Sequence, residues 1–309
     1  MEKINIKGLE ISRMSLGTVQ LGVNYGINNT TGKPSQELSN KILDCAIENG
    51  INVLDTAGGY GDSEKVIGKW LKTVPDEKKP FIVTKARDLD HSSYENLRSD
   101  LFNRVKSSKE NLGVETLDML MLHHFDEYLE DKENVMRVMK ELKASGEVKY
   151  IGASAYSYHD YGLLAEAGFD AAQIPVNIFD WEQIVNGEIK KLADSNMMVF
   201  ARSVYLQGLI FQNPETLSPK MDYCKEPLEK FHVLCKRYEL SPAEMALSFV
   251  LSLDGIHSLV LGSEKVEQVE ENTNLMNRTI RFNDEQMAEI RELFETIDKR
   301  VTNPSVWNK

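Results

Sequence analysis

The chain has 309 residues, of which 41% are hydrophobic, 8% aromatic and 27% charged. These are ordinary values for a soluble globular protein, and they exclude the disordered, collagen-like and disulfide-scaffold classes. Lys and Arg together number 36, and Asp and Glu together number 48, so the formal net charge is −12. Because a strongly acidic surface repels phosphate groups, we expect neither a nucleic acid nor an anionic membrane as a partner.

Cysteine usage and the absence of targeting patterns indicate a cytoplasmic protein. Cys45, Cys224 and Cys235 are too few and too irregularly spaced for a disulfide framework or a zinc motif. The first ten residues are charged and lack the apolar run of a signal peptide. No apolar run approaches the roughly 20 residues of a membrane-spanning helix. No linker divides the chain, so we also expect a single domain over residues 1–309.

The hydrophobic pattern predicts a hairpin followed by alternating strands and helices. Residues 3–12 form two short alternating runs around Lys7-Gly8, which is typical of a β-hairpin. Apolar runs then predict strands over residues 14–19, 52–55, 81–85, 117–122, 148–154, 171–176, 198–203 and 257–263. Helical periodicity predicts helices over residues 36–49, 62–73, 93–111, 132–144, 158–167, 182–194, 226–238, 242–253 and 264–274. We expect irregular structure over residues 209–226 and over the tail from residue 301.

This alternation predicts an α/β fold, specifically a (β/α)8 TIM barrel with an N-terminal β-hairpin. Short apolar strands that alternate with helices favour a parallel sheet covered by helices, and eight such units favour a closed barrel. The competing architecture is an open doubly wound sheet, which usually carries a GxGxxG turn after its first strand. The first strand is followed instead by Gly17-Thr18-Val19-Gln20-Leu21-Gly22. A second glycine run, Gly59-Tyr60-Gly61-Asp62-Ser63-Glu64, has glutamate where the third glycine belongs.

Polar residues end three consecutive predicted strands. Asp55, Lys85 and His123 follow the second, third and fourth strands, and Tyr60 follows Asp55 after two glycines that allow the loop to fold over the barrel mouth. Each residue alone is compatible with a structural role, such as an ion pair or a packed surface tyrosine. Active sites of such barrels lie at the carboxyl ends of the strands. The joint occurrence of these four residues therefore favours a catalytic site.

At these positions the sequence resembles the aldo-keto reductases, and in particular a bacterial branch of that family. The matching motifs are Asp55-Thr56-Ala57-x-x-Tyr60-Gly61-x-Ser63-Glu64, Val83-Thr84-Lys85, Leu117-Asp118 with His123, Gly146-Glu147-Val148-Lys149-Tyr150-Ile151-Gly152-x-Ser154, Gln173, and Gly262-Ser263 with Glu271-Asn272. The run from Leu16 to Gly22, followed by Tyr25-Gly26-Ile27, is similar to the bacterial branch. Together these motifs cover essentially the whole chain.

The resemblance implies an NADP(H)-dependent reductase that transfers hydride from nicotinamide to an aldehyde or ketone, with sugar carbonyls among the candidates. Negative charge then develops on the carbonyl oxygen, so a general acid must donate a proton to it. The resemblance implies Tyr60 as this acid and His123 as a donor that orients the carbonyl. An unperturbed tyrosine has a pKa near 10, so such an acid needs a neighbouring cation. Lys85, held by Asp55, is implied to supply it, and no metal is required.

The resemblance also implies a cofactor site along the barrel mouth. The implied contacts are Gly17, Thr18, Val19, Asp55, Ser154, Gln173, Arg202, Ser203, Gly208, Gly262, Ser263, Lys265, Gln268, Glu271 and Asn272. Arg202 stands where many members carry a tyrosine that stacks under the nicotinamide, and Ala155 replaces a usual asparagine. Gly262 and Gln268 replace the Lys and Arg of many NADPH-specific members. Ser263 and Lys265 remain available for a 2′-phosphate, so NADP(H) is favoured and NAD(H) remains an alternative.

Three other functions are weighed against this one. A non-catalytic redox sensor that binds the nicotinamide nucleotide would not need four intact catalytic positions. A Schiff-base lyase with Lys85 as nucleophile leaves Tyr60 and residues 262–272 without a role. A metal-dependent hydrolase needs a histidine cluster, whereas His123 and His124 are adjacent, and neighbours on a strand face opposite sides. The expected partner is therefore a small carbonyl compound, and no recognisable pattern indicates its identity or an oligomeric state.

Overall fold

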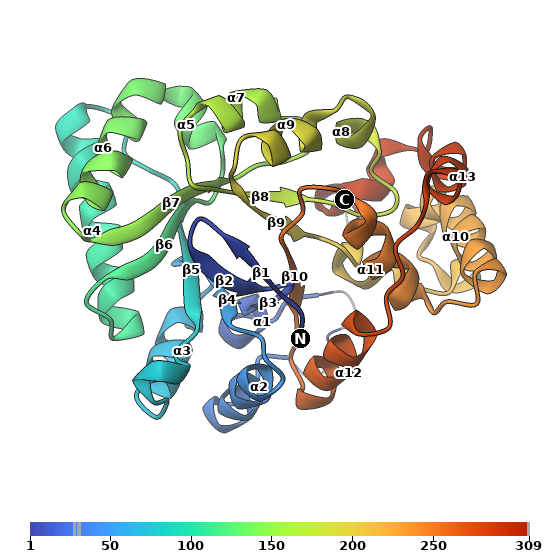
Figure 1. Cartoon of the computed structure of the whole chain (residues 1–309), viewed down its shortest axis with the longest axis horizontal. Coiled ribbons are helices and arrows are strands. Elements are labelled where there is room, and N and C mark those ends of the chain that lie inside the picture. The colour runs from blue at the N-terminus through green and yellow to red at the C-terminus, as the bar shows by residue number, and fades with distance from the viewer. Residues whose placement is uncertain (27–28, 30–31, 308–309) are drawn as a thin grey trace.

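The computed structural model describes residues 1–26, 29 and 32–307, which form a closed barrel of eight parallel strands surrounded by helices (Figure 1). Each strand pairs with its neighbour in sequence, and the last strand closes the ring on the first. The barrel strands are β3 (Met14–Gly17), β4 (Val53–Asp55), β5 (Phe81–Ala86), β6 (Leu117–Leu122), β7 (Val148–Ser154), β8 (Ala171–Pro175), β9 (Met198–Arg202) and β10 (Ser258–Gly262). This arrangement confirms the predicted (β/α)8 barrel.

Helices connect successive strands on the outside of the barrel. They are α2 (Gln36–Glu48), α3 (Ser63–Leu71), α4 (Tyr94–Leu112), α6 (Lys132–Ala144), α7 (Tyr161–Glu166), α9 (Glu188–Asp194), α11 (Pro242–Ser252) and α12 (Val266–Met276). Capping residues determine where several of these helices begin. The Ser35 hydroxyl accepts a hydrogen bond from the backbone N–H of Leu38 at 3.2 Å, and Ser241 forms a reciprocal capping box with Glu244. In the part of the chain that the structure describes, no helix is both long and apolar enough to cross a membrane.

The N-terminal hairpin is confirmed, and it closes one end of the barrel. Strands β1 (Lys3–Ile6) and β2 (Leu9–Ser12) pair through a turn in which Lys7 and Gly8 have φ values of 52° and 79°. Two successive positive φ angles are typical of the tight turns that suit the twist of a hairpin. The side chain of Ile11 packs with the barrel interior, which consists of Val53, Val83, Met119, Met121, Ala171, Met198 and Phe200. Figure 1 shows the hairpin across the centre of the barrel. The interior is thus filled at this end, and the loops at the opposite end are left to form a site.

Several predicted elements have different bounds in the structure. The strand predicted over residues 14–19 ends at Gly17, because a short helix, α1 (Val19–Gly22), begins there. The helix predicted over residues 182–194 is divided into α8 (Glu182–Val185) and α9, because Gly187 has a left-handed φ of 72°. The helix predicted from residue 158 begins only at Tyr161, where the Asp160 side chain caps it.

The structure also contains helices that the sequence analysis did not predict. They are α5 (Asp126–Glu130), α13 (Asp284–Phe294) and the 3-10 helices η1 (Asp76–Lys78), η2 (Leu206–Phe211), η3 (Pro214–Thr216), η4 (Pro219–Cys224), η5 (Lys299–Thr302) and η6 (Pro304–Val306). Residues 209–226 are therefore a series of tight turns that leads into α10 (Lys225–Arg237), not an irregular loop. The tail is also packed: the Trp307 side chain is buried, and its Nε1 donates to the Arg300 carbonyl oxygen at 3.0 Å.

Candidate active site

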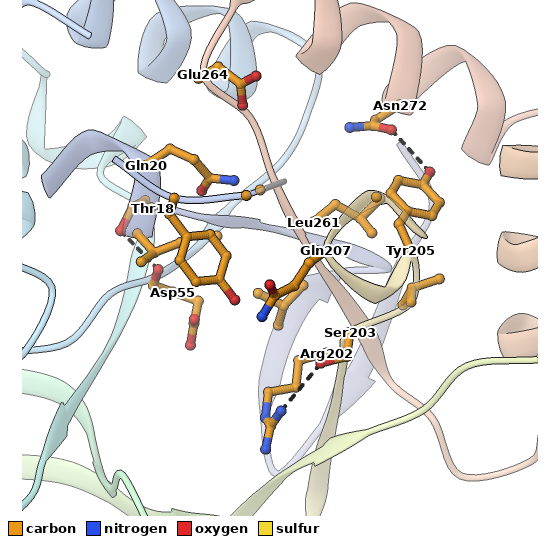
Figure 2. A pocket seen from close by; sticks show the side chains of 18 of the residues that line it. Thr18, Gln20, Asp55, Arg202, Ser203, Tyr205, Gln207, Leu261, Glu264 and Asn272 are labelled. Atoms are coloured by element: carbon orange, nitrogen blue, oxygen red, sulfur yellow. Dashed lines mark hydrogen bonds between the residues drawn. The ribbon is translucent and has the colours of Figure 1, made fainter. Parts of the chain in front are cut away.

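A cavity of about 610 Å³ lies at the carboxyl ends of the barrel strands. It extends from Asp55, Tyr60 and His123 to residues around the start of α12. Figure 2 shows Asp55 and Arg202 toward one side of this cavity and Glu264 and Asn272 toward another. The cavity is lined by every site residue predicted from the sequence except Lys85, Ser263 and Lys265. Ile27 of the Tyr25-Gly26-Ile27 run lies outside the described residues.

Lys85 lies beneath the cavity, where its side chain is fully buried. Its Nζ donates to Asp55 Oδ1 at 2.6 Å and to the Thr56 carbonyl oxygen at 2.9 Å. The Gln173 side chain also donates to Asp55 Oδ1, at 2.7 Å. The same ammonium lies 5.1 Å from the centre of the Tyr60 ring. Because the carboxylate accepts both hydrogen bonds, it holds the ammonium at a fixed place next to the tyrosine.

His123 lines the cavity next to Tyr60. The two ring centres are 5.4 Å apart, and the rings are nearly perpendicular at 81°. Burial, assisted by the positive charge of Lys85, lowers the pKa of His123 to about 3. The ring is therefore neutral at neutral pH, with one nitrogen as donor and the other as acceptor. Among the described residues, its buried Nδ1 has no hydrogen-bond partner.

Side chains next to Tyr60 in the sequence hold its loop in place. The Thr18 hydroxyl donates to the Asp55 carbonyl oxygen at 2.9 Å and is hydrogen-bonded to the Ser63 hydroxyl at 2.8 Å. Glu64 is buried and accepts from the Thr84 hydroxyl at 2.7 Å. These contacts join the loops after β3 and β4 to β5. The Ser and Glu of the motif therefore position the tyrosine without lining the cavity.

Two glycines allow the loop after β3 to cross the Tyr60 loop at very short range. A Cβ atom at Gly22 would lie 1.6 Å from the Tyr60 carbonyl oxygen. Gly61 has a left-handed φ of 57°, and a Cβ atom there would lie 2.6 Å from the Gly22 carbonyl oxygen. Neither position has room for a side chain, so this backbone contact fixes where Tyr60 stands.

The expectation that His123 and His124 face opposite sides is wrong. Their rings are stacked, with centres 5.1 Å apart and planes 12° apart. The reason is that β6 ends at Leu122, so the alternation of a strand no longer governs the two residues. The His124 ring in turn stacks on Tyr156 at 5.7 Å. Within residues 1–26, 29 and 32–307, no group of three or more His, Cys, Asp or Glu side chains is arranged to hold a metal ion.

Arg202, at the end of β9, continues this row of rings. Its guanidinium carbon lies 4.6 Å from the centre of the Tyr156 ring. Its Nη2 donates to the Ala155 carbonyl oxygen at 3.0 Å, and its Nη1 donates to the Ser203 hydroxyl at 3.3 Å (Figure 2). The guanidinium therefore has a flat support and a defined orientation at the cavity wall.

The segment after Arg202 carries an unusual backbone. Ser203, Leu206 and Gln207 have φ values of 62°, 46° and 52°, and Gly208 has a φ of 96°. Left-handed conformations of non-glycine residues are uncommon, and they gather at binding sites and active sites. Three of these four residues, Ser203, Gln207 and Gly208, line the cavity. We regard this segment as a preformed backbone cradle along the cavity.

The end of the cavity near α12 is held by Gln268. Its Oε1 accepts from the backbone N–H groups of Glu264 and Lys265 at 2.8 and 3.2 Å, and its Nε2 donates to Glu264 Oε1 at 3.0 Å. Glu264 lines the cavity, whereas Lys265 is exposed and Ser263 is buried behind the cavity wall. The Ser263 hydroxyl has no hydrogen-bond partner among the described residues.

Gly262 and Asn272 also line the end of the cavity near α12. A Cβ atom at Gly262 would lie 2.4 Å from Gln20 Nε2, so the glycine makes room for this buried glutamine. Gln20 Oε1 has no hydrogen-bond partner among the described residues. The Tyr205 hydroxyl donates to Asn272 Oδ1 at 3.1 Å, as Figure 2 shows. This contact joins the cradle after β9 to α12.

Several residues that line the cavity were not named individually from the sequence, namely Gln20, Tyr25, Tyr156, Tyr205, Gln207, Phe211 and Glu264. Most of them lie in loops that meet only when the barrel closes, so no local pattern identifies them. Tyr156 and Glu264 are exceptions, because each lies two residues beyond the end of a strand, β7 and β10 respectively, and could have been inspected with the other strand ends.

Comparisons with known proteins agree with this geometry. The model of the Aldo/keto reductase family matches residues 13–295. An Escherichia coli K12 protein named NADH-specific methylglyoxal reductase is 28% identical, and the match covers 97% of this chain and 100% of that protein. The aldo-keto reductase YhdN of Bacillus subtilis is 24% identical over 93% of this chain and 91% of its own length. Among solved structures, an aldo-keto reductase from Bacillus halodurans in its holo form has a TM-score of 0.74 and 20% identity, with coverage of 98% and 100%.

Proposed function

The chain belongs to the aldo/keto reductase family of NAD(P)H-dependent oxidoreductases that act on carbonyl groups, and on that premise we propose that Tyr60 is its general acid. In the proposed reaction an aldehyde or ketone receives hydride from a nicotinamide cofactor and a proton from Tyr60. The observation that carries this proposal is the buried Lys85–Asp55 pair, which places a fixed ammonium 5.1 Å from the centre of the Tyr60 ring.

The residues along the cavity fit an extended dinucleotide. The cavity extends from the catalytic residues to α12, and the backbone cradle at 203–208 lies along it. Gln20 Oε1 is a buried acceptor without a partner among the described residues, and such an atom calls for a donor from a ligand or water. When bound, the cofactor supplies the hydride. We assign Ser154 and Gln173 to its carboxamide, as the sequence predicts.

The residues around Tyr60 explain the proton transfer. Tyr60 donates its phenolic proton to the carbonyl oxygen as negative charge develops there. The Lys85 ammonium stabilises the phenolate that remains, because opposite charges attract strongly where water is excluded. Asp55 holds that ammonium in place, since its carboxylate accepts a hydrogen bond of 2.6 Å from Nζ.

His123 has a supporting role in this proposal. With a pKa of about 3, its ring is neutral at neutral pH, and the remaining N–H of a neutral imidazole is too weakly acidic for a general acid. A neutral imidazole still donates one hydrogen bond, and a donor next to Tyr60 orients the carbonyl oxygen toward the phenol. This assignment leaves Tyr60 as the acid of the site.

For the cofactor, the sequence favours NADP(H), whereas the charges around the cavity favour NAD(H), and we propose NAD(H). Glu264 and Glu271 line the end near α12, and Arg202 is the one Lys or Arg among the described residues of the lining. A carboxylate at this end accepts hydrogen bonds from the ribose hydroxyls of NAD(H) and repels the 2′-phosphate of NADP(H). The Escherichia coli relative is named an NADH-specific reductase, which agrees with this choice.

The test is a reduction assay with the purified protein. We expect 4-nitrobenzaldehyde to be reduced to its alcohol with stoichiometric oxidation of NADH, and kcat/KM to be on the order of tenfold lower with NADPH. A protein that binds the cofactor but oxidises it with none of a panel of aldehydes and ketones would instead be a redox sensor. Trapping of a substrate by borohydride on Lys85 would indicate the lyase alternative.

A further inference from the structure

We propose that Arg202 binds an anionic group, a carboxylate or a phosphate, on the carbonyl substrate, so that this reductase prefers anionic aldehydes or ketones. The inference rests on the proposed function and adds the substrate class. It replaces the stacking role under the nicotinamide that the sequence implied for this residue.

The position of Arg202 places it at the catalytic end of the cavity. Its guanidinium packs on Tyr156, Tyr156 stacks on His124, and His124 stacks on His123. It also donates to the carbonyl oxygen of Ala155, which directly follows the end of β7. Two rings, those of His124 and Tyr156, therefore separate the Arg202 guanidinium from His123, and Arg202, Tyr156 and His123 line the same cavity.

The charge of Arg202 is uncompensated. Its two hydrogen bonds go to neutral oxygens, on Ala155 and Ser203. The other cations near His123 are paired: Lys85 with Asp55 at 2.6 Å, and Arg87 with Asp88 at 3.2 Å. Among the described residues, no carboxylate lies within 4.0 Å of Arg202. Water solvates this half-buried guanidinium when no ligand is bound in the cavity. A ligand that displaces the water removes that solvation, so a ligand that brings a counter-ion is favoured over a neutral one.

The geometry suits a planar anion. A guanidinium has five N–H donors in a rigid fork, and two of them are used here. The contact with Tyr156 and the two hydrogen bonds fix the orientation of that fork, so less rotational freedom is lost when an anion binds. Carboxylates and phosphates accept such a fork with two parallel hydrogen bonds. The remaining donors are therefore ready for one anionic group.

The pyrophosphate of the cofactor is a second anion that Arg202 could bind. The experiment below distinguishes an anionic group on the substrate from this pyrophosphate. The substrates are 4-carboxybenzaldehyde and 4-nitrobenzaldehyde, whose substituents have nearly the same planar shape but differ in charge. The measured quantity is the ratio of their kcat/KM values, so that differences in general activity cancel. The variants are Arg202→Met, Arg202→Lys, and Arg87→Met as a matched control whose charge is already paired. A second pair, succinic semialdehyde and butanal, repeats the comparison with a flexible chain.

We expect Arg202→Met to lower the charged-to-neutral ratio about 10- to 100-fold in at least one pair, which is typical of a lost charged hydrogen bond. Arg202→Lys should keep part of the preference, and Arg87→Met should keep it fully. The dissociation constant of NADH, measured by fluorescence quenching, should be unchanged in all three variants.

Two outcomes would overturn the proposal. One is an unchanged ratio for both substrate pairs. The other is an equal loss for charged and neutral substrates together with weaker NADH binding, which would place Arg202 on the cofactor. Reduction of 4-nitrobenzaldehyde by the wild-type protein tests the proposed function separately, so the two proposals fail in different ways.

Discussion

At the scale of single residues, Lys85 joins stability and activity because its ammonium is buried against Asp55. Lys85→Met leaves the carboxylate buried without its cation, and we expect the free energy of unfolding to fall by about 3–5 kcal/mol. We also expect kcat to fall about 10²–10⁴-fold, because the Tyr60 phenolate loses its stabilising charge. Urea denaturation and steady-state reduction of 4-nitrobenzaldehyde measure the two effects.

The double variant Asp55→Asn/Lys85→Met separates the effect on stability from the effect on kcat. It removes both charges, and the asparagine oxygen can still accept the hydrogen bond from Gln173. We expect most of the lost stability to return while kcat stays low. Recovery of activity along with stability would show that Lys85 contributes only to folding.

His123 gives a pH dependence with a defined sign. Its pKa is about 3 in the folded protein and near 6.5 in the unfolded chain, so the unfolded chain binds the extra proton between these values. Its contribution to stability is therefore complete above pH 6.5 and is lost as the pH falls toward 3. Between pH 7.5 and 5 we expect wild type to lose about 1–2 kcal/mol more than His123→Asn. Equal losses in thermal or urea denaturation would contradict the neutral, buried histidine.

The residues that end strands could be found from the sequence, because a polar residue after an apolar run marks the barrel mouth. Asp55, Lys85 and His123 were found in this way, and Tyr60 through its spacing from Asp55. The surroundings of Arg202 could not be found, because they depend on Tyr156 and on a stack of rings from another loop. Glu264 lies two residues beyond the end of β10, so it could have been found in the same way as Tyr156, by inspection of the residues that follow strand ends.

At the scale of elements, the crossing of two loops positions Tyr60, the proposed general acid. Gly22→Ala would place a methyl group 1.6 Å from the Tyr60 carbonyl oxygen, so one of the loops must move. We expect a loss of stability of about 1–3 kcal/mol and a fall in kcat of up to about 10²-fold, since small displacements of catalytic groups are costly. Gly58→Ala is the matched control in the Tyr60 loop, because its nearest neighbour, the Lys85 carbonyl oxygen, is at an ordinary 3.6 Å. Unaltered kinetics in Gly22→Ala would show that this crossing does not fix Tyr60.

The strands were predictable because each is a short apolar run between polar turns. Strands β6 and β7 have the predicted bounds, and β5 extends one residue further. Helix α13 was not predicted, although Asn283 and Gln286 form a capping box at its start. It follows the eighth strand–helix unit, so the repeating pattern of strands and helices did not predict another helix there. Helices α8 and α9 were merged because the glycine that divides them is also compatible with a continuous helix.

At the scale of the whole molecule, we propose that residues 1–309 form one domain. Support comes from the closed ring of strands and from a hydrophobic cluster that extends from Met14 to Trp307. The family model, which covers residues 13–295, extends over the whole ring. A single cooperative unfolding transition by two different probes is the expected behaviour of such a unit.

The distribution of charge along the cavity is a second property of the whole molecule. The catalytic end carries the cation Arg202, and the end near α12 carries Glu264 and Glu271. We expect Glu264→Gln to reduce the preference for NADH over NADPH by about tenfold, because one repulsive charge is removed and the shape is kept. The ratio of the two dissociation constants measures the effect. Glu267→Gln is the control, since Glu267 is exposed on the first turn of α12 and does not line the cavity. If Glu264→Gln leaves the ratio unchanged, Glu264 does not select the cofactor.

The central claim, that Tyr60 donates the proton, is tested most directly by Tyr60→Phe. This change removes one oxygen and keeps the ring that packs beside His123 and Lys85, so folding and NADH binding should be preserved. The measurement is kcat for reduction of 4-nitrobenzaldehyde, with the dissociation constant of NADH determined on the same preparation. We predict a fall of about 10²–10⁴-fold in kcat at an unchanged dissociation constant. A Tyr60→Phe protein whose kcat stays within about threefold of wild type, well short of a general-acid contribution, would contradict the account.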